Sequence, residues 1–382
     1  MKIEQVYTLV NTATKEVLGE SAIVNEDLSN VVSVGESIAN ANLYDKFVGA
    51  LLNRIAKSIF SIRAYTGRAP SVLMDAWEFG SIVQKVHMKL PDAEENESWS
   101  LVDGATYEEN QFYKPSVSVK LWNHKTTFEI PISIAEEQLK QSFLSASEMA
   151  RFVAMLYQGV ENSMTLKFDA LIMRTICNFI GATIQDGTSG VNVIHLLTEY
   201  KTDVDPSSTL TSADCLYNKD FLRYAVFRMK QVATRLATYS TLFNLGGAEK
   251  HTPRDMLKIV LHETIDAGVG AFLQSDTFHD ELVKLPVADV VPFWQGSGTG
   301  YALADTTSIN VDVLDTSGTK QTVSEDYIVG VMFDRDALGV TGYNRRTPSK
   351  YVAKAEFYNY WYKEDAGYFN DYNENFVVFL AD

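Results

Sequence analysis

The chain has 382 residues and a net charge of −16, with 46% hydrophobic and 21% charged residues. This length allows two or three domains or one elaborate domain, and the composition is that of an ordinary packed protein. The acidic excess disfavours a surface that grips nucleic acid or an anionic membrane, because both need clustered Lys and Arg.

Cysteine usage and hydropathy restrict the class further. Cys177 and Cys215 are the only cysteines, and both lie in apolar, helix-patterned sequence. A disulfide framework and a cysteine-rich metal site are therefore excluded, and a reducing compartment such as a cell's cytoplasm is indicated. The N-terminus lacks the apolar core of a signal peptide, and no run of 18 or more apolar residues occurs. The sequence predicts a soluble protein without a recognisable leader.

The N-terminal region divides into two parts. Residues 1–37 are weakly patterned, which predicts an extended arm without a core of its own. Residues 42–62 predict an amphipathic helix, because large apolar side chains recur every four positions along them. These side chains are Phe47, Leu51, Ile55 and Ile59.

A long hairpin with an acidic loop comes next. Apolar and polar residues alternate through 82–88, 117–121 and 128–132, which predicts strands. The loop at 91–112 has seven acids and no Lys or Arg; the acids are Asp92, Glu94, Glu95, Glu97, Asp103, Glu108 and Glu109. A hairpin this polar cannot bury its own tip. The loop is therefore either solvated or rests on a second molecule.

A long helix is predicted over 146–180. It starts with a capping box formed by Ser145 and Glu148, and its apolar positions recur at helical spacing. At 1.5 Å per residue it would be roughly 50 Å long, which exceeds the width of a small domain. Such a helix usually forms the spine of a flat or elongated molecule.

Beyond a turn-rich boundary at Gly181, helices and strands alternate. Helices are predicted at 218–240, with Asn218 as N-cap, and at 264–282; strands are predicted at 256–262, 287–294, 308–314 and 327–333. This alternation predicts an α/β or α+β region. The last segment, 343–382, is dense in aromatic residues, which favour strands and suit a core or an interface.

Three short motifs invite a chemical interpretation. His262-Glu263 resembles the start of a zinc-protease helix, but position 266 is Asp where a second His is needed, so a strand-to-helix junction is the better interpretation. The sequence GSGTG at 296–300 is followed by a predicted strand, so it is interpreted as a turn or loop and not as a phosphate cradle.

The third motif is Asp334-Arg335-Asp336 at the end of an apolar run. Two aspartates at a strand end can hold a metal or share a proton. Arg335 supplies an internal charge partner, so a strand end closed by local salt bridges is the preferred interpretation. The six histidines are scattered, and no catalytic, cofactor-binding or metal residue is assigned.

The order of these elements resembles the Hong Kong 97 fold of tailed-bacteriophage major capsid proteins. The segments VVPFWQG, IVGVMFDRDALGV and EFYNYWYKEDAGYFNDYNENFVVFL are similar to closing segments of capsid proteins from phages of Gram-positive hosts, and the last also resembles the phi29-type head protein. The resemblance spans the whole chain and implies an α+β fold with six parts. These are an N-terminal arm and first helix (1–75), an extended hairpin loop (76–134), a peripheral domain with the spine helix (135–185), an axial domain (186–338), return strands of the peripheral domain (339–372) and a final axial strand (373–382).

The resemblance also implies a function and partners. The chain would self-assemble as pentamers and hexamers into an icosahedral shell in the host cytoplasm, enclosing double-stranded DNA without specific binding and without a membrane. The strong negative charge suits an inner wall to which DNA does not stick. Because the arm begins almost at Met1, a separate scaffolding protein is implied, with a portal protein at one vertex and a decoration or head-fibre protein as further candidates.

The hairpin loop would lie across an adjacent subunit and would need a basic landing site there. The candidate intersubunit contact residues are Glu94, Glu95, Glu97, Trp99, Glu108 and Glu109 on the loop, and Arg345, Arg346 and Lys350 as the landing site. Two kinds of alternative remain open: another structural protein, such as a tail-tube or encapsulin-like shell protein, and a metal-dependent hydrolase that uses Asp334, Asp336 and His262.

Overall fold

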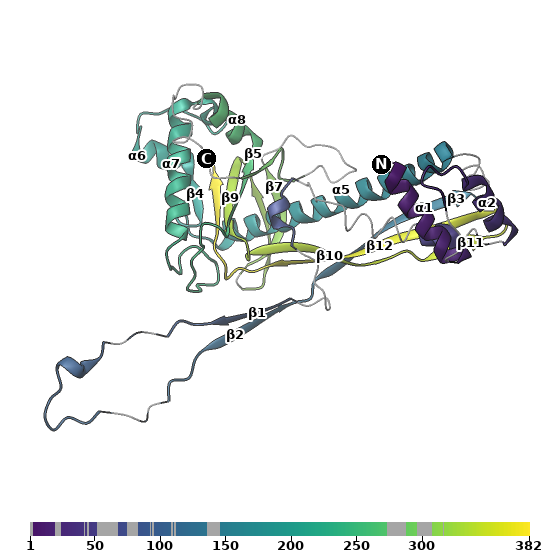
Figure 1. Cartoon of the computed structure of the whole chain (residues 1–382). Coiled ribbons are helices and arrows are strands. Elements are labelled where there is room, and N and C mark those ends of the chain that lie inside the picture. Colours follow the sequence, from purple (N-terminus) through teal and green to yellow (C-terminus); the bar gives the residue numbers. More distant parts are fainter. Residues whose placement is uncertain are drawn as a thin grey trace. The chain divides into compact units, whose positions relative to one another are not determined.

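The chain forms two compact units (Figure 1). The computed structural model describes residues 3–19, 24–41, 43, 46–51, 68–74, 83–91, 93, 95–107, 110, 112–135, 146–272, 288–295, 308–315 and 317–382. The first unit comprises Met1–Phe79, Lys125–Arg174 and Val340–Tyr368, and the second comprises Gly80–His124, Thr175–Gly339 and Phe369–Asp382.

The first unit is built on a four-stranded sheet. Its strands are β3 (Lys125–Ala135), β10 (Leu338–Arg346), β11 (Ser349–Val352) and β12 (Phe357–Asn370), in the order β10-β12-β11, with β3 also paired to β12. β3 and β12 are antiparallel over eleven residue pairs, from Ala135 opposite Phe357 to Lys125 opposite Gly367. Tyr358, Tyr360 and Tyr362 alternate along β12 and are buried on one face, so part of the aromatic segment serves a core, as the sequence indicated.

The N-terminal segment of the first unit contains two helices, so the prediction of an extended arm over 1–37 is wrong. They form α1 (Ile3–Leu18) and α2 (Val31–Asn40), and η1 (Pro70–Val72) follows further along. Apolar side chains on both helices are buried: Leu9, Val10, Ala13, Val31, Val34 and Ile38. The helix predicted at 42–62 is present at 46–51, where Phe47 and Leu51 are buried. Ile55 and Ile59 lie outside the described residues.

The long helix is α5 (Ala146–Asp186), with 41 residues. It is about 60 Å long at 1.5 Å per residue. The continuous helix predicted over 146–180 is confirmed; Ser145, half of the expected capping box, lies outside the described residues. α5 begins in the first unit and ends in the second. Among the described helices, none is both long and apolar enough to cross a membrane.

The second unit contains a five-stranded mixed sheet of order β4-β13-β9-β5-β6. Its strands are β4 (Val193–His195), β5 (Leu257–His262), β6 (Asp289–Val291), β9 (Ile328–Asp334) and β13 (Phe376–Leu380). All residues of β9 and β13 are buried. The strands predicted at 256–262, 287–294 and 327–333 are confirmed as β5, β6 and β9, and the final strand implied at 373–382 is confirmed as β13, whereas β4 was not predicted. The apolar character of β9 and β13 arises because both faces of the sheet are covered.

Helices cover one face of this sheet (Figure 1). They are α6 (Leu196–Asp203), η3 (Cys215–Tyr217), α7 (Lys219–Leu236) and α8 (Glu263–Phe272). The predicted N-cap of α7 is confirmed, since the Asn218 side chain accepts hydrogen bonds from the backbone N–H groups of Asp220 and Phe221. On the other face, Phe179 of α5 stacks on Phe376 with ring centroids 4.0 Å apart.

A glycine at position 330 lets the central strands approach each other. A Cβ atom there would lie 2.6 Å from a methyl group of Leu261 and 3.1 Å from the carbonyl oxygen of Val260. Two further antiparallel pairs complete the second unit: β7 (Ile309–Leu314) with β8 (Lys320–Glu325), and β1 (Val83–Met88) with β2 (Val117–Trp122). Between β1 and β2 lies η2 (Glu97–Trp99).

Candidate intersubunit contact surface

The predicted hairpin is present as an antiparallel ribbon of β1 and β2. Its register places Val86 opposite Val119 and Lys85 opposite Lys120. Directly opposed residues share a face of a ribbon, and neighbours along a strand alternate between faces. One face therefore carries both lysines. The other carries a continuous apolar strip, which we call the ribbon strip: Val86, Met88, Val117, Val119 and Leu121.

The ribbon strip is exposed along its whole length. Each of its five side chains is more than half accessible to solvent, and Leu121 is the most exposed at 63%. A buried strand pair would present such a face to a core, whereas the side chains of the ribbon strip are accessible to solvent. Contiguous exposed apolar surface is typical of interaction sites, so the ribbon strip is a candidate contact surface.

The loop beyond the ribbon presents large apolar side chains as well. Trp99 is 98% exposed and Phe112 is 85% exposed, and Leu101, Val102 and Tyr113 are also exposed. Local hydrogen bonds shape this loop: the Asn96 side chain accepts from the N–H of Ser98 at 2.8 Å, and the Tyr107 hydroxyl accepts from the N–H of Val102 at 3.1 Å. These hydrogen bonds give the loop local turns on either side of the exposed Trp99.

The acidic residues predicted to make contacts are only partly described. Glu95 is exposed, and Glu97 begins η2. Glu94, Glu108 and Glu109 lie outside the described residues. Sequence reasoning emphasised the acids and named only Trp99 among the apolar loop residues. Phe112 and Tyr113 were missed, although aromatic residues inside a polar loop are a readable signal of an interface.

The predicted basic landing site lies on β10 and β11 in the first unit. Arg345 contacts the buried carboxylate of Glu364 at 3.1 Å. Arg346 makes a two-pronged contact with Asp365, at 2.9 Å and 3.0 Å. Both arginines thus already have partners on β12 of the same chain, while Lys350 is exposed. Of the three predicted residues, Lys350 is the one best placed to meet a second molecule.

The Arg346–Asp365 pair makes the stability of the first unit pH-dependent. Arg346, Thr127 and Asn344 donate hydrogen bonds to Asp365 and lower the pKa of its carboxyl to about 2. Because the pKa of this carboxyl is lower in the folded chain than in the unfolded chain, the ionised form stabilises the fold. This contribution to the free energy of unfolding is fully present above the ordinary pKa near 4 and is lost as the pH falls through about 2. Because Arg346 is partly exposed, the contribution at neutral pH is about 1–2 kcal/mol.

We therefore expect Asp365→Asn to lower the free energy of unfolding of the first unit by about 1–2 kcal/mol at pH 6, and the difference from wild type to shrink between pH 4 and pH 2. Denaturant titrations across this pH range measure it. Glu129→Gln is the matched control, since it breaks the more exposed Lys363–Glu129 pair on the same sheet. A constant difference between pH 6 and pH 2 would contradict the assignment.

The Asp334-Arg335-Asp336 motif forms the turn between β9 and β10. The buried Asp334 carboxylate accepts a hydrogen bond from the N–H of Asp336 at 2.9 Å, and burial raises the pKa of Asp334. His262 ends β5 directly before α8, the predicted strand-to-helix junction. Within the described part of the chain, no group of three or more His, Cys, Asp or Glu side chains could hold a metal ion. The GSGTG motif at 296–300 lies outside the described residues.

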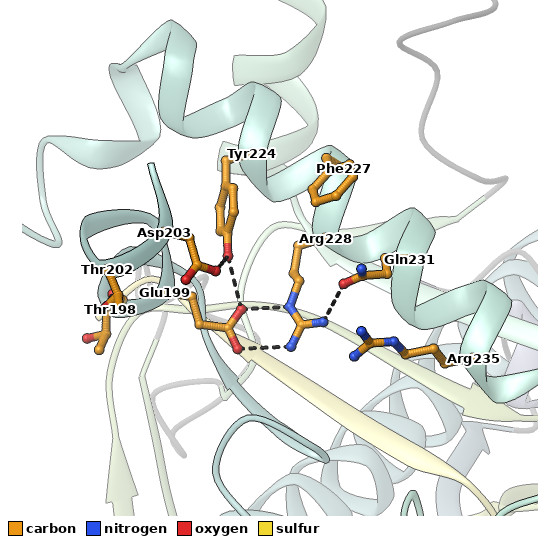
Figure 2. A pocket seen from close by; sticks show the side chains of 9 residues that line it. All are labelled: Thr198, Glu199, Thr202, Asp203, Tyr224, Phe227, Arg228, Gln231 and Arg235. Atoms are coloured by element: carbon orange, nitrogen blue, oxygen red, sulfur yellow. Dashed lines mark hydrogen bonds and ion pairs between the residues drawn. The ribbon is translucent and has the colours of Figure 1, made fainter. Parts of the chain in front are cut away.

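A cavity of about 450 Å³ lies between α6 and α7. Figure 2 shows its lining side chains: Thr198, Glu199, Thr202, Asp203, Tyr224, Phe227, Arg228, Gln231 and Arg235. The buried Arg228 makes two contacts with Glu199, at 2.7 Å and 3.0 Å, and donates to Gln231 at 2.7 Å. The Tyr224 hydroxyl donates to Asp203 at 3.1 Å. These contacts tie α6 to α7.

The Tyr224 hydroxyl in this cavity stays protonated. Burial and the nearby charges of Glu199 and Asp203 raise the pKa of Tyr224 far above its ordinary value. A protonated hydroxyl suits the hydrogen bond that Tyr224 donates to Asp203. Sequence analysis did not single out any of these residues, because they meet only when α6 folds onto α7.

Comparison with solved structures relates this fold to phage particles. A chain in the structure of the head fibre and inner core protein gp22 of native bacteriophage P68 aligns with TM-score 0.50 and 9% identity, over 84% of this chain and 86% of that chain. A chain in the capsid structure of Staphylococcus phage Andhra aligns with TM-score 0.49 and 9% identity, over 83% and 85% of the two chains. At this identity, the likeness to the P68 chain concerns the fold alone. No curated protein matches the sequence.

The sequence itself gives the class, because a family model of phage structural proteins matches almost the whole chain. The chain belongs to the family of Phi29-like phage major capsid proteins, whose model matches residues 10–380. It is thus a shell protein of a tailed bacteriophage and a component of the virion. The mixed helix-and-sheet capsid fold and the shell function predicted from sequence are confirmed, whereas the extended N-terminal arm is not. The encapsulin-like and hydrolase alternatives are not supported.

Proposed function

We propose that copies of the chain tile an icosahedral shell as pentamers and hexamers, with the hairpin of each copy lying across an adjacent copy. The supporting observation is the apolar surface of the hairpin, formed by the ribbon strip together with Trp99 and Phe112. Water contact with this surface is unfavourable by about 25 cal/mol per Å². A second copy that covers it gains this free energy, and many such contacts add up across a closed lattice.

The remaining partners follow from the same proposal. A separate scaffolding protein directs assembly in the host cytoplasm, a portal protein occupies one vertex, and a decoration or head-fibre protein binds the outside. The shell encloses DNA without specific binding, and the subunit has no catalytic role, cofactor or membrane partner. The net charge of −16 supports a wall that repels DNA. The division into peripheral and axial domains is part of this proposal, without the extended N-terminal arm.

The acidic loop adds an electrostatic contact. Glu94, Glu95, Glu97, Glu108 and Glu109 would face a basic residue of the adjacent copy, and the exposed Lys350 is the best available candidate. Contacts between exposed charges contribute less than about 1 kcal/mol each, so they guide docking more than they hold it. The apolar residues carry most of the association free energy.

Photo-crosslinking tests the proposed docking. The phage genes are expressed with a photoreactive aromatic residue in place of Trp99, and purified shells are irradiated. We expect covalent dimers and higher multiples of the chain, because the position 99 side chain would touch a neighbour. Mass spectrometry of the crosslinked peptides identifies the landing site.

Two controls make the result decisive. The same variant irradiated as dilute unassembled subunit should remain monomeric on a denaturing gel. A photoreactive residue at the buried position 360 should crosslink within its own chain, because Tyr360 is fully buried. If shells carrying the probe at position 99 gave only monomers, the hairpin would not lie on an adjacent copy.

A further inference from the structure

The lysine face of the ribbon meets a pair of buried acids. Lys85 and Lys120 are directly opposed across β1 and β2. Like charges in this arrangement repel each other unless an acid lies between them. Asp371 is the acid between these two lysines: its carboxylate lies 3.1 Å from the Lys85 ammonium and 2.9 Å from the Lys120 ammonium. One aspartate therefore bridges both strands of the ribbon.

A second acid extends this cluster. Glu374 contacts Lys85 from the ribbon and, at 2.7 Å, Lys250 from the loop before β5. The side chains of Asp371 and Glu374 are only 3% and 6% exposed. Burial alone would lower the pKa of Lys85, but the hydrogen bond and charge of Glu374, together with Asp371, outweigh it and raise that pKa. We call these five residues the ribbon latch.

The acids of the ribbon latch lie on the turn between β12 and β13, which backbone hydrogen bonds hold in place. The N–H of Asp371 donates to the carbonyl of Ala337 at 2.7 Å, and the N–H of Asp334 donates to the carbonyl of Asn375 at 3.0 Å. The turn is thereby fixed to the β9–β10 corner of the sheet. An aromatic contact also attaches the ribbon to β12, since Trp122 at the end of β2 packs on Phe369 with ring centroids 5.4 Å apart.

An isolated two-stranded ribbon is marginally stable and has no preferred direction of its own. Here its lysine face is held on the second unit, and the ribbon strip on the opposite face is left exposed. We propose that the ribbon latch fixes the direction of the hairpin and thereby presents the ribbon strip to a second copy of the chain. The second half of this statement rests on the proposed function, in which that copy covers the hairpin.

Spin-label distance measurements on the purified unassembled subunit test the latch. Labels are attached to new cysteines at Ala105 in the loop and Thr234 on α7, since both native cysteines are buried. The variant Lys85→Met/Lys120→Met removes both charges and keeps the side-chain length. The matched control is Lys89→Met/Lys114→Met, which changes two exposed lysines just beyond the ribbon.

We expect a narrow distance distribution in wild type and control, and a width at least doubled in Lys85→Met/Lys120→Met. Shell yield by sedimentation should fall at least tenfold in that variant only. Lys85→Arg/Lys120→Arg keeps both charges and should restore a narrow distribution, which separates release of the latch from misfolding. Circular dichroism verifies that each variant is folded.

Three results would count against the proposal or part of it. A distribution that stays narrow in the folded Met variant overturns the latch. A broad distribution in the Arg variant would also contradict it, because charge would then not be the cause. A broad distribution with normal shell yield overturns the link between latch and docking. Crosslinking from position 99 in wild-type shells reports docking itself, so failure of the proposed function is seen separately.

Discussion

The double variant Trp99→Ser/Phe112→Ser should fold normally and fail to form shells. Both side chains are almost fully exposed in the subunit, at 98% and 85%, so their loss changes the free energy of unfolding by less than about 0.5 kcal/mol. If an adjacent copy buries them, each contributes about 1.5–3 kcal/mol to association. Since 1.4 kcal/mol is a factor of ten, the concentration needed for assembly should rise at least about 100-fold.

Light scattering across a range of subunit concentrations measures this threshold, and thermal unfolding of the subunit measures its stability. Trp99→Phe/Phe112→Tyr is the matched control, because it keeps two aromatic rings and should assemble near the wild-type concentration. Shells formed by the Ser variant at the wild-type concentration would show that these residues do not make the contact. A loss of subunit stability would assign them to the fold instead.

The strands and the long helix could be predicted because their apolar residues follow the period of the element. The alternation through Val86 and Val119 predicted the ribbon, and the spacing along 146–180 predicted α5. The buried strand β9 was readable as an apolar run, because strands covered on both faces need such runs. These signals lie within one element and need no knowledge of what packs against it.

The N-terminal helices show where this reasoning fails. In α2 the buried residues Val31, Val34 and Ile38 follow helical spacing, but the segment is short and contains Ser33 and Gly35. In α1 the buried face includes Thr14, whose hydroxyl donates to the carbonyl of Val10, so a polar residue interrupts the apolar pattern. Tertiary burial fixes these helices more than local pattern does.

The charged contacts could not be predicted from sequence at all. Arg346 and Asp365 are 19 residues apart, and Lys120 and Asp371 are 251 residues apart. The basic segment Arg345–Lys350 therefore suggested a landing site for another copy. In the structure, Arg345 and Arg346 instead form ion pairs with acids of the same chain. Pairing of distant charges depends on register and strand order, which composition does not contain.

Phe376→Ala should have the largest effect on the second unit. Its ring stacks on Phe179 at 4.0 Å and on Phe333 at 5.6 Å, so it joins α5, β9 and β13. Truncating a fully buried Phe costs about 3–5 kcal/mol, because apolar contact is lost and a cavity remains. Amide protons of β9 and β13 should then exchange about a hundredfold faster or more, as measured by hydrogen-exchange mass spectrometry.

Two variants test whether this loss comes from the stacked core. Tyr217→Ala removes an aromatic side chain that is 67% exposed in the same unit, and should leave protection of β9 and β13 within about 0.5 kcal/mol of wild type. Phe376→Leu keeps most of the apolar volume and should fall between wild type and Phe376→Ala. Unchanged exchange in Phe376→Ala would mean that α5 is not essential to the sheet. The sheet would then be stabilised by the packing of α6, α7 and α8 on its other face. The contacts of α5 would stabilise only the first unit.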